Sequence, residues 1–188
     1  MSVKTNITGI ILAGGKSTRM GSDKGLILYK NKPFTQHIID AMTPLVSNIL
    51  IVSNNIAYDV FNTIRINDDI QDAGPLSGLY SGLNYSKTEY NMVLSCDVPL
   101  IETIVLQKLV DSISSEIDVL QIESNSKTMP LVGIYKKNCS NKFLELLNNN
   151  QLRVKEAINF FKTKNIVLEN HLAKTVTNIN TKEQLNCI

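Results

Sequence analysis

The sequence has few cysteines and no excess of charge, and these shortages exclude several classes of protein. Its three cysteines, Cys96, Cys139 and Cys187, lie far apart, with no Cys-x-x-Cys pair and no nearby histidine. A disulfide framework or a structural zinc site is therefore not expected, and a cytoplasmic, reducing environment fits best. Nineteen basic residues oppose seventeen acidic ones, and the net charge of +2 is far below that of proteins that bind nucleic acid.

Long apolar runs are missing as well. The amino-terminal segment MSVKTNITGIILAGG passes from a short apolar stretch directly into two glycines. Nowhere do about 18 apolar residues follow one another, so neither a membrane span nor an export signal is expected. With 188 residues, 43% of them hydrophobic, the chain suits one well-buried domain over residues 1–188.

What the chain does contain is an alternation of short β-branched runs with longer segments of helical period. This alternation is typical of a parallel sheet with crossover helices. The runs PLVGIY and IDVLQI follow each other closely, which favours an antiparallel or edge pair. We expect strands at 7–12, 48–53, 64–66, 90–96, 117–122, 130–135 and 164–170, separated by helices.

A glycine-rich turn, LAGGKSTRMGSDK at 12–24, follows the first expected strand. Gly14 and Gly15 permit a sharp turn whose backbone N–H groups can approach an anion, although an ordinary turn would use them too. Arg19 offers a bidentate fork and Lys24 a point charge, so the pair suits several phosphate groups. The spacing fits neither G-x-x-x-x-G-K-[ST] nor G-x-G-x-x-G, which indicates a different phosphate loop.

Acidic residues follow two other expected strands. Asp97 directly follows the strand 90–96, and Asp68 and Asp69 follow the strand 64–66. Ligands of open α/β sheets bind beyond the carboxyl ends of the strands. Asp97 could cap the next helix or, beside a polyphosphate, hold Mg²⁺, which needs only one or two protein carboxylates.

No motif for a covalent intermediate is visible. The sequence has no G-x-S-x-G elbow and no convincing Cys–His arrangement. Phosphoryl or nucleotidyl transfer can proceed without one, because positioning and electrostatic stabilisation of the phosphates supply most of the catalysis.

Four ordered segments, LAGGKSTRMGSDKGL, GPLSGL, LSCDVPL and NINTKEQL, resemble the molybdenum cofactor guanylyltransferases, the MobA-like branch of the nucleotidyltransferases. The resemblance spans nearly the whole chain. It implies a three-layer αβα fold with a mostly parallel, Rossmann-like sheet of the nucleotide-diphospho-sugar transferase type. It also implies Mg²⁺-dependent transfer of GMP from GTP to the terminal phosphate of molybdopterin or Mo-molybdopterin. Pyrophosphate is released, and a molybdoenzyme or its chaperone is a further implied partner.

Carried over position by position, the resemblance also assigns roles to single residues. Arg19, Lys24 and Asp97 would be catalytic, and Asp97 would be the magnesium ligand. Asp69 competes with Asp68 for the contact that follows the strand 64–66. The GTP-binding set would be Leu12, Ala13, Gly14, Gly15, Lys24, Asn55, Asp68 and Asp97, and the pterin-side set Arg153, Asn178 and Asn180.

Two alternatives remain open at this point. A related nucleotidyltransferase could use CTP or a sugar or alditol phosphate acceptor, although Gly14 favours guanine because the cytidylyl branch tends to have LAAG. The other alternative is a catalytically silent nucleotide-binding module. The presence of Arg19, Lys24 and Asp97 argues against it.

Overall fold

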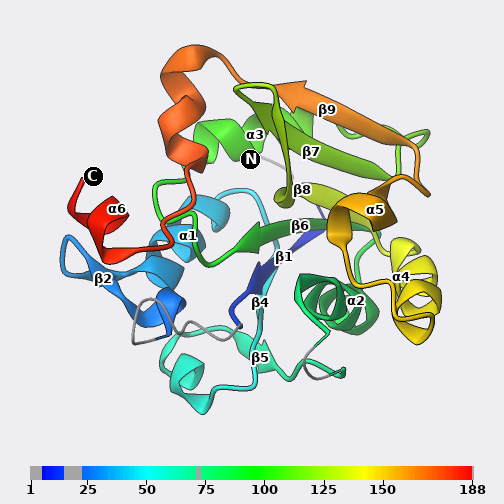
Figure 1. The fold of residues 1–188 in the computed structure, drawn as a ribbon, viewed down its shortest axis with the longest axis horizontal. Helices are drawn as coiled ribbons and strands as arrows, with labels where there is room; N and C mark the ends of the chain where they lie inside the picture. The colour runs from blue at the N-terminus through cyan, green and yellow to red at the C-terminus, as the bar shows by residue number, and fades with distance from the viewer. Residues whose placement is uncertain (1–5, 15–22, 71–72, 188) are drawn as a thin grey trace.

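The structure is a computed structural model that describes residues 6–14, 23–70 and 73–187 (Figure 1). Its centre is a seven-stranded sheet in the order β5-β4-β1-β6-β8-β7-β9. The pairs from β5 to β6 and the pair β7–β9 are parallel, whereas β8 runs antiparallel to both of its neighbours. The strands are β1 (Ile7–Leu12), β4 (Asn48–Val52), β5 (Ile64–Ile66), β6 (Tyr90–Ser95), β7 (Val119–Ser124), β8 (Lys127–Lys136) and β9 (Thr163–Val167).

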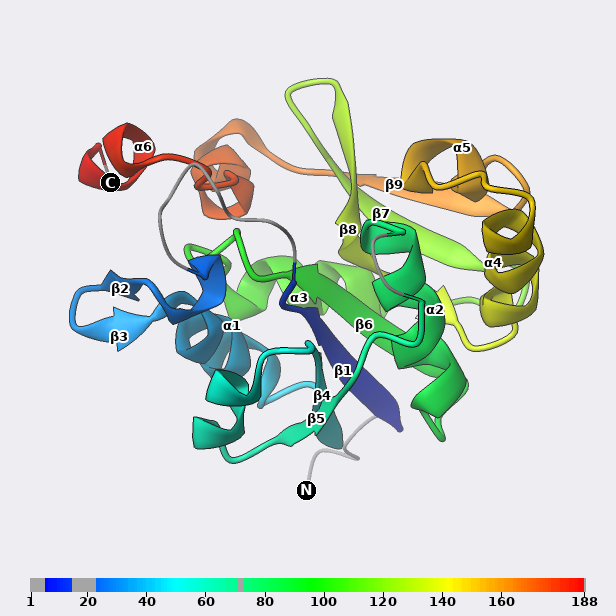
Figure 2. The same ribbon diagram turned by 60° about the horizontal axis from the view of Figure 1, so that its bottom comes forward.

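Helices cover both faces of the sheet, so the architecture has three layers (Figure 2). One face packs against α1 (Phe34–Met42), α3 (Thr103–Asp111) and the 3₁₀ segment η3 (Asn170–Val176). The other packs against α2 (Pro75–Tyr85), α4 (Cys139–Asn148) and α5 (Val154–Ile158). The predicted α/β fold with three αβα layers and a mostly parallel sheet is confirmed.

The pattern of β1 explains its central place. All six residues of this strand are buried, and alternate side chains enter different cores. Ile7 and Ile11 join the core beneath α1 and α3, while Ile10 and Leu12 join the core beneath α2 and α4. A strand covered on both faces must be apolar at nearly every position, which is what the run ITGIIL shows.

The remaining short elements lie around the carboxyl edge of the parallel strands. They include η1 (Lys24–Leu26), η2 (Ile56–Val60) and α6 (Lys182–Asn186). Thr181 caps α6 through a reciprocal capping box with Gln184. Within the described part of the chain, none of the helices is long and apolar enough to cross a membrane.

Sequence reasoning placed the seven strands of the sheet but missed a small hairpin. Strands β2 (Leu28–Tyr29) and β3 (Lys32–Pro33) pair antiparallel, with Lys30 and Asn31 both at positive φ between them. Two adjacent residues of positive φ are the mark of a type I′ hairpin turn. The expected pairing of 117–122 with 130–135 is antiparallel as predicted, but this pair is internal, because β9 adds the edge strand.

Candidate active site

The carboxyl ends of the parallel strands meet at one edge of the sheet, and short backbone contacts hold the chain together just beyond them. The amide of Ala13 donates to the carbonyl of Val52 at 3.0 Å, and the amide of Cys96 donates to the carbonyl of Leu12 at 3.0 Å. Ala13 is fully buried and Gly14 is exposed. The predicted site residues that follow β1, β4, β5 and β6 therefore share this edge.

A partly buried anchor, Asp23, precedes Lys24. The carboxylate of Asp23 accepts from the Asn55 Nδ2 at 3.0 Å, from the backbone amide of Gly25 at 3.3 Å and from the Tyr58 hydroxyl. Tyr58 is itself buried, at 1% exposure, so its hydroxyl is a fixed donor. Asp23 thereby ties the end of the glycine-rich segment to the turn after β4, and the position of Lys24 follows from that tie.

Lys24 points at the carboxyl-terminal segment of the chain. Its Nζ donates to Asn180 Oδ1 at 2.6 Å, although 156 residues separate the two. The partner is a neutral amide, and Lys24 has no ion-pair partner within 6–14, 23–70 and 73–187. Its positive charge is therefore available to an anionic ligand.

Asp97, just after the end of β6, is hydrogen-bonded to the same carboxyl-terminal segment. Its backbone carbonyl accepts from the amide of Ile179 at 2.8 Å, and its Oδ2 accepts from Asn178 Nδ2 at 3.2 Å. The carboxyl-terminal segment thus brings Asn178 and Asn180 to Asp97 and Lys24, respectively.

The second carboxylate oxygen of Asp97 suits a metal ion. Oδ1 is buried and has no hydrogen-bond partner among the described residues. No group of three His, Cys, Asp or Glu side chains in that part of the chain could hold a metal ion by itself. A single free carboxylate oxygen fits a cation that takes its other ligands from water and phosphate, as Mg²⁺ usually does.

Asp68 lies at the end of β5 and is held by α2. Ser77 Oγ donates to its Oδ2 at 2.5 Å, and Ser81 Oγ donates to its Oδ1 at 3.1 Å. Asp69 uses its backbone amide to donate to Ser81 Oγ at 2.9 Å. Of the two candidates, Asp68 therefore has its carboxylate oriented by the scaffold, whereas Asp69 contributes a backbone contact.

Asn55 lies at the edge as predicted, but its side chain serves the protein. Its Nδ2 donates to Asp23, and its Oδ1 accepts from the amide of Ala57 at 3.0 Å at the start of η2. Both polar groups of the side chain therefore have partners in the fold. A direct contact between Asn55 and a nucleotide stays a prediction, and it would have to compete with these two bonds.

Cys96 lies between the charged residues of the site. Burial and, to a smaller extent, the neighbouring charges of Asp97 and Asp23 raise the pKa of its thiol to about 12, against a smaller lowering by Lys24. The thiol is therefore protonated near neutral pH and is no nucleophile there. This agrees with the expectation that the chemistry needs no covalent intermediate.

The structure places Arg153 away from the other predicted site residues and does not describe Gly15 or Arg19. Arg153 precedes α5, where its side chain is 82% exposed and pairs with Glu156 at 2.9 Å. No contact joins it to Lys24, Asp97, Asn178 or Asn180 in the described chain. Gly15 and Arg19 lie outside the described residues, so their assigned roles stay predictions.

Sequence reasoning missed Asp23 and Tyr58. The signal for Asp23 was local, because aspartate is a preferred cap before a helical turn and here it caps η1. Tyr58 gave no such signal. Its contact with Asp23 joins residues 35 positions apart and depends on the packing of η2 beside the loop.

Comparisons with known proteins agree with this geometry. Residues 9–160 match the family described as the MobA-like NTP transferase domain. A Flavobacterium johnsoniae protein named "Probable molybdenum cofactor guanylyltransferase" is 38% identical over 180 residues, which cover 96% of this chain and 95% of the relative. A Clostridium perfringens protein of the same name is 36% identical over 152 residues, covering 80% of this chain and 76% of the relative.

Solved structures show the same fold. A crystal structure from Aquifex aeolicus superposes with a TM-score of 0.83 at 26% identity, covering 96% of this chain and 97% of that one. A molybdopterin-guanine dinucleotide biosynthesis protein A from Archaeoglobus fulgidus gives a TM-score of 0.82 at 16% identity, covering 96% and 95% of the two chains. With the family match over most of its length and a 38% identical relative over nearly all of it, the chain belongs to the MobA-like NTP transferase family.

Proposed function

We propose that this protein is a guanylyltransferase of molybdenum cofactor biosynthesis, with residues 1–188 acting as one catalytic domain. It transfers GMP from GTP to the terminal phosphate of molybdopterin or Mo-molybdopterin. One observation carries the proposal. The same carboxyl-terminal segment contacts both Lys24, which has no ion-pair partner among the described residues, and Asp97, whose buried Oδ1 has no hydrogen-bond partner there. Relatives over most of this length carry the name of that activity.

The reaction requires no general base. The second pKa of a phosphate monoester is about 6, so an acceptor phosphate is largely ionised near neutral pH. One of its oxygens attacks the α-phosphorus of GTP, a new P–O–P bond forms, and the bond to the bridging α–β oxygen breaks. Pyrophosphate leaves with that electron pair. The barrier is the approach of two anions, and fixed positive charge lowers it.

Each residue of the site has a part in that approach. Lys24, held in place by Asp23, neutralises phosphate charge, and Asp97 is the residue that would hold Mg²⁺. When bound, Mg²⁺ would supply further neutralisation of the triphosphate. Arg19 is proposed to stabilise the leaving pyrophosphate, and Gly14 and Gly15 let the backbone approach the nucleoside.

The remaining roles follow the same arrangement. We assign Asp68 to the nucleotide because Ser77 and Ser81 orient its carboxylate at the strand edge. Asn178 and Asn180 are assigned to the acceptor side, where they already contact Asp97 and Lys24. Arg153 is assigned there as well, and a molybdoenzyme or its chaperone would receive the product.

The test is to incubate the purified protein with Mg²⁺, molybdopterin and each nucleoside triphosphate separately, and to measure pyrophosphate and dinucleotide. We expect product with GTP and little with CTP. Product with CTP alone would overturn the base assignment, and no product with any triphosphate would favour a silent nucleotide-binding module. Omission of Mg²⁺ should stop the reaction, and its return should restore it.

A further inference from the structure

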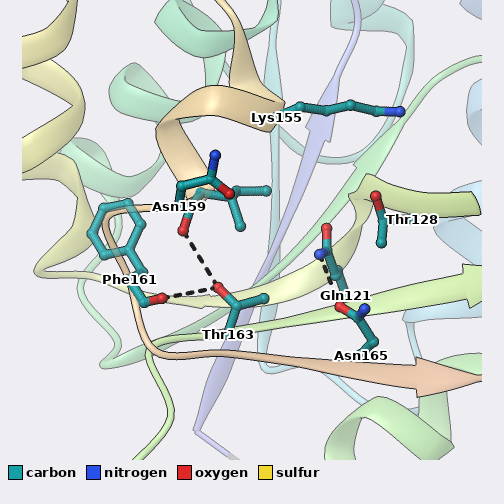
Figure 3. A pocket seen from close by; sticks show the side chains of 8 residues that line it. Gln121, Thr128, Lys155, Asn159, Phe161, Thr163 and Asn165 are labelled. Carbon is teal, nitrogen blue, oxygen red and sulfur yellow. Dashed lines mark hydrogen bonds between the residues drawn. The ribbon is translucent and has the colours of Figure 1, made fainter.

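A polar cavity of about 490 Å³ lies in the carboxyl-terminal half of the molecule, between α5 and the strands β7, β8 and β9 (Figure 3). No residue of the predicted site lines it. Amide and hydroxyl side chains of the strands form its floor, and Lys155, Ile158 and Asn159 of the α5 region form its opposite wall. Phe161 adds an aromatic side chain to the same lining.

The orientation of the Gln121 side chain places a hydrogen-bond acceptor at this cavity. The carboxylate of Glu123 can only accept, so it takes the amide hydrogen of Asn165 Nδ2 at 2.9 Å. Asn165 Oδ1 must then accept, and it does so from Gln121 Nε2 at 2.9 Å. This chain of contacts turns Gln121 Oε1 away from Asn165 and into the cavity, as Figure 3 shows.

Gln121 Oε1 is a buried acceptor without a donor. The residue is 6% exposed, and this oxygen has no hydrogen-bond partner among the described residues. An unpaired buried polar group costs about 1–3 kcal/mol. A ligand that brings an N–H group to this oxygen would recover that cost, and one without such a group would not.

The rest of the lining complements such a ligand. Lys155 has no ion-pair partner among the described residues, and in Figure 3 it extends over the same space. Thr128 and Asn159 add further polar groups, while Phe161 and Ile158 offer apolar surface. The set suits a flat, fused heterocycle that carries an N–H donor beside a carbonyl acceptor.

We propose that this cavity binds the pterin ring of the acceptor, with Gln121 Oε1 accepting from a ring or exocyclic N–H group and Lys155 donating to the ring carbonyl. The proposal rests on the proposed function for the identity of the ligand. Guanine presents the same edge chemistry, so the choice between the two depends on where the cavity lies.

The sheet register places the cavity at the right separation from the reacting groups. Gln121 pairs with Gly133, and Gly133 pairs with Val93, so Gln121 lies two strands from β6 and level with Val93. Asp97 lies four residues farther along. With strands about 4.8 Å apart and about 3.3 Å of rise per residue, the Cα separation of Gln121 and Asp97 is roughly 16 Å. That distance is comparable with the length of a phosphate ester carried on a fused heterocycle.

The nucleoside is expected elsewhere. The glycine turn follows β1 and Asp68 follows β5, on the other side of β6 from the cavity. A GTP whose base contacts Gly14 would not also fill a space beneath α5. The cavity therefore fits the second substrate, and its residues would distinguish acceptors by their ring rather than by their phosphate.

A binding experiment tests this without turnover. 6-Hydroxymethylpterin, which carries no phosphate, is titrated into ¹⁵N-labelled protein while the side-chain amide signals of Gln121 and Asn165 are followed by NMR. We expect saturable shifts at these two amides, with little change at Asn55. A parallel titration with GMP is expected to move Asn55 and to leave Gln121 unmoved. Absence of a saturable pterin shift up to about 5 mM, a binding energy of only about 3 kcal/mol, would overturn the proposal.

Variants sharpen the assignment. Gln121→Met removes the free oxygen and nearly keeps the volume, and we expect it to weaken pterin binding roughly 3- to 10-fold, the loss of about one neutral hydrogen bond. Its control is Gln107→Met on α3, whose amide contacts only Asp111 at the surface. Lys155→Met is exposed and should not disturb folding, so it keeps the test valid if Gln121→Met is unstable.

Turnover separates this inference from the proposed function. In an active enzyme, Gln121→Met and Lys155→Met should raise the KM for molybdopterin and leave the KM for GTP and kcat unchanged. Unchanged acceptor KM in both variants would overturn the cavity assignment while guanylyl transfer stands. Pterin binding in a protein that makes no dinucleotide would leave the cavity assignment standing and contradict the function. Displacement of the pterin by GMP would assign the cavity to a guanine base instead and overturn the proposal.

Discussion

The two parts of the sheet handle different kinds of chemistry. In the part formed by β5, β4, β1 and β6, all strands are parallel, so their carboxyl ends collect charged side chains at one edge. In the part formed by β8, β7 and β9, one strand is reversed, and the polar groups line a cavity on the face of the sheet beneath α5. The first arrangement suits phosphates and a metal ion, and the second suits an uncharged ring.

Loops and strands hold the side chains of these two parts in different ways. Lys24 and Asp97 come from segments far apart in sequence, and both are held by contacts with the segment that carries Asn178 and Asn180. Gln121 is fixed by Asn165 on the adjacent strand β9, and Asn165 is held in turn by Glu123, which lies on the same strand as Gln121. We therefore expect changes at the edge to affect the chemical step and changes in the cavity to affect binding of one substrate.

The largest expected effect is at Asp97. Asp97→Asn removes one anionic oxygen at the end of β6 and should lower kcat by about 100- to 1000-fold, as the loss of a main electrostatic group in an active site does. The measurement is pyrophosphate release with GTP and molybdopterin. Asp111→Asn, at the surface end of α3, is the matched control and should keep normal activity. Near-normal turnover of Asp97→Asn with an intact fold would remove Asp97 from the reaction.

Lys24→Met is expected to have the second-largest effect on activity, because it removes a charge and keeps most of the side-chain volume. A hydrogen bond to a charged group contributes about 1.5–3 kcal/mol, so kcat/KM for GTP should fall about 10- to 100-fold. Lys87→Met, an exposed change just before β6 at the opposite end of the strand, is the control. If both variants retain full kcat/KM, Lys24 is a surface contact of Asn180 and not a phosphate ligand.

Substitutions at two glycines distinguish a requirement of the fold from a requirement of ligand binding. A Cβ at Gly14 would meet nothing within 4 Å, whereas one at Gly25 would overlap the Tyr58 hydroxyl and Thr35 Oγ1. Gly25→Ala should therefore lower the free energy of unfolding by about 1–3 kcal/mol, the usual cost of overpacking. Gly14→Ala should leave stability unchanged and raise the KM for GTP roughly tenfold if the nucleoside approaches the backbone there.

Thermal unfolding and GTP kinetics on both glycine variants check this pair. A stable Gly25→Ala protein would show that the Asp23 anchor tolerates displacement. An unaffected KM in Gly14→Ala would indicate that no ligand comes close to that part of the turn. Either result would contradict the assignment of Gly25 to stability and of Gly14 to ligand binding.

The smallest effect is expected from the cysteines. Cys96 and Cys139 are buried on opposite faces of the sheet, and burial raises the pKa of each thiol to about 12. At pH 8 both therefore remain protonated and inaccessible, while Cys187 is exposed. Mass spectrometry after iodoacetamide treatment should find label on Cys187 alone, with activity retained. Rapid labelling of Cys96 with loss of turnover would show that the edge opens in solution.

Much of the edge could be predicted from the sequence because its signals are local. ITGIIL indicates a strand buried on both faces, Pro99 marks the end of the strand before Asp97, and the turn residues after β1 lie directly beside it in the chain. The same holds for the cap of α6 at Thr181. These elements depend on hydrophobic period and backbone conformation, which neighbouring residues determine.

The cavity could not be predicted in this way. Gln121 and Asn165 look like ordinary polar residues of two strands, and nothing in their sequence neighbourhood says that β9 pairs with β7. The same is true of Tyr58 and Asp23, whose contact gives Lys24 its place. Such pairs are set by which strands and loops come together, and this depends on the packing of both layers of helices.

The α/β architecture and the carboxylate at the end of β6 could thus be read from local sequence, which also predicts a phosphate-binding role for 12–24. The contacts of Asn178 and Asn180 with Asp97 and Lys24, the anchoring role of Asp23 and the free oxygen of Gln121 at the cavity emerge from the folded chain alone. The difference arises from the sequence separation over which the interactions act. Period, capping and turn chemistry act over a few residues, whereas burial and the pairing of donors with acceptors are settled between segments up to 156 residues apart.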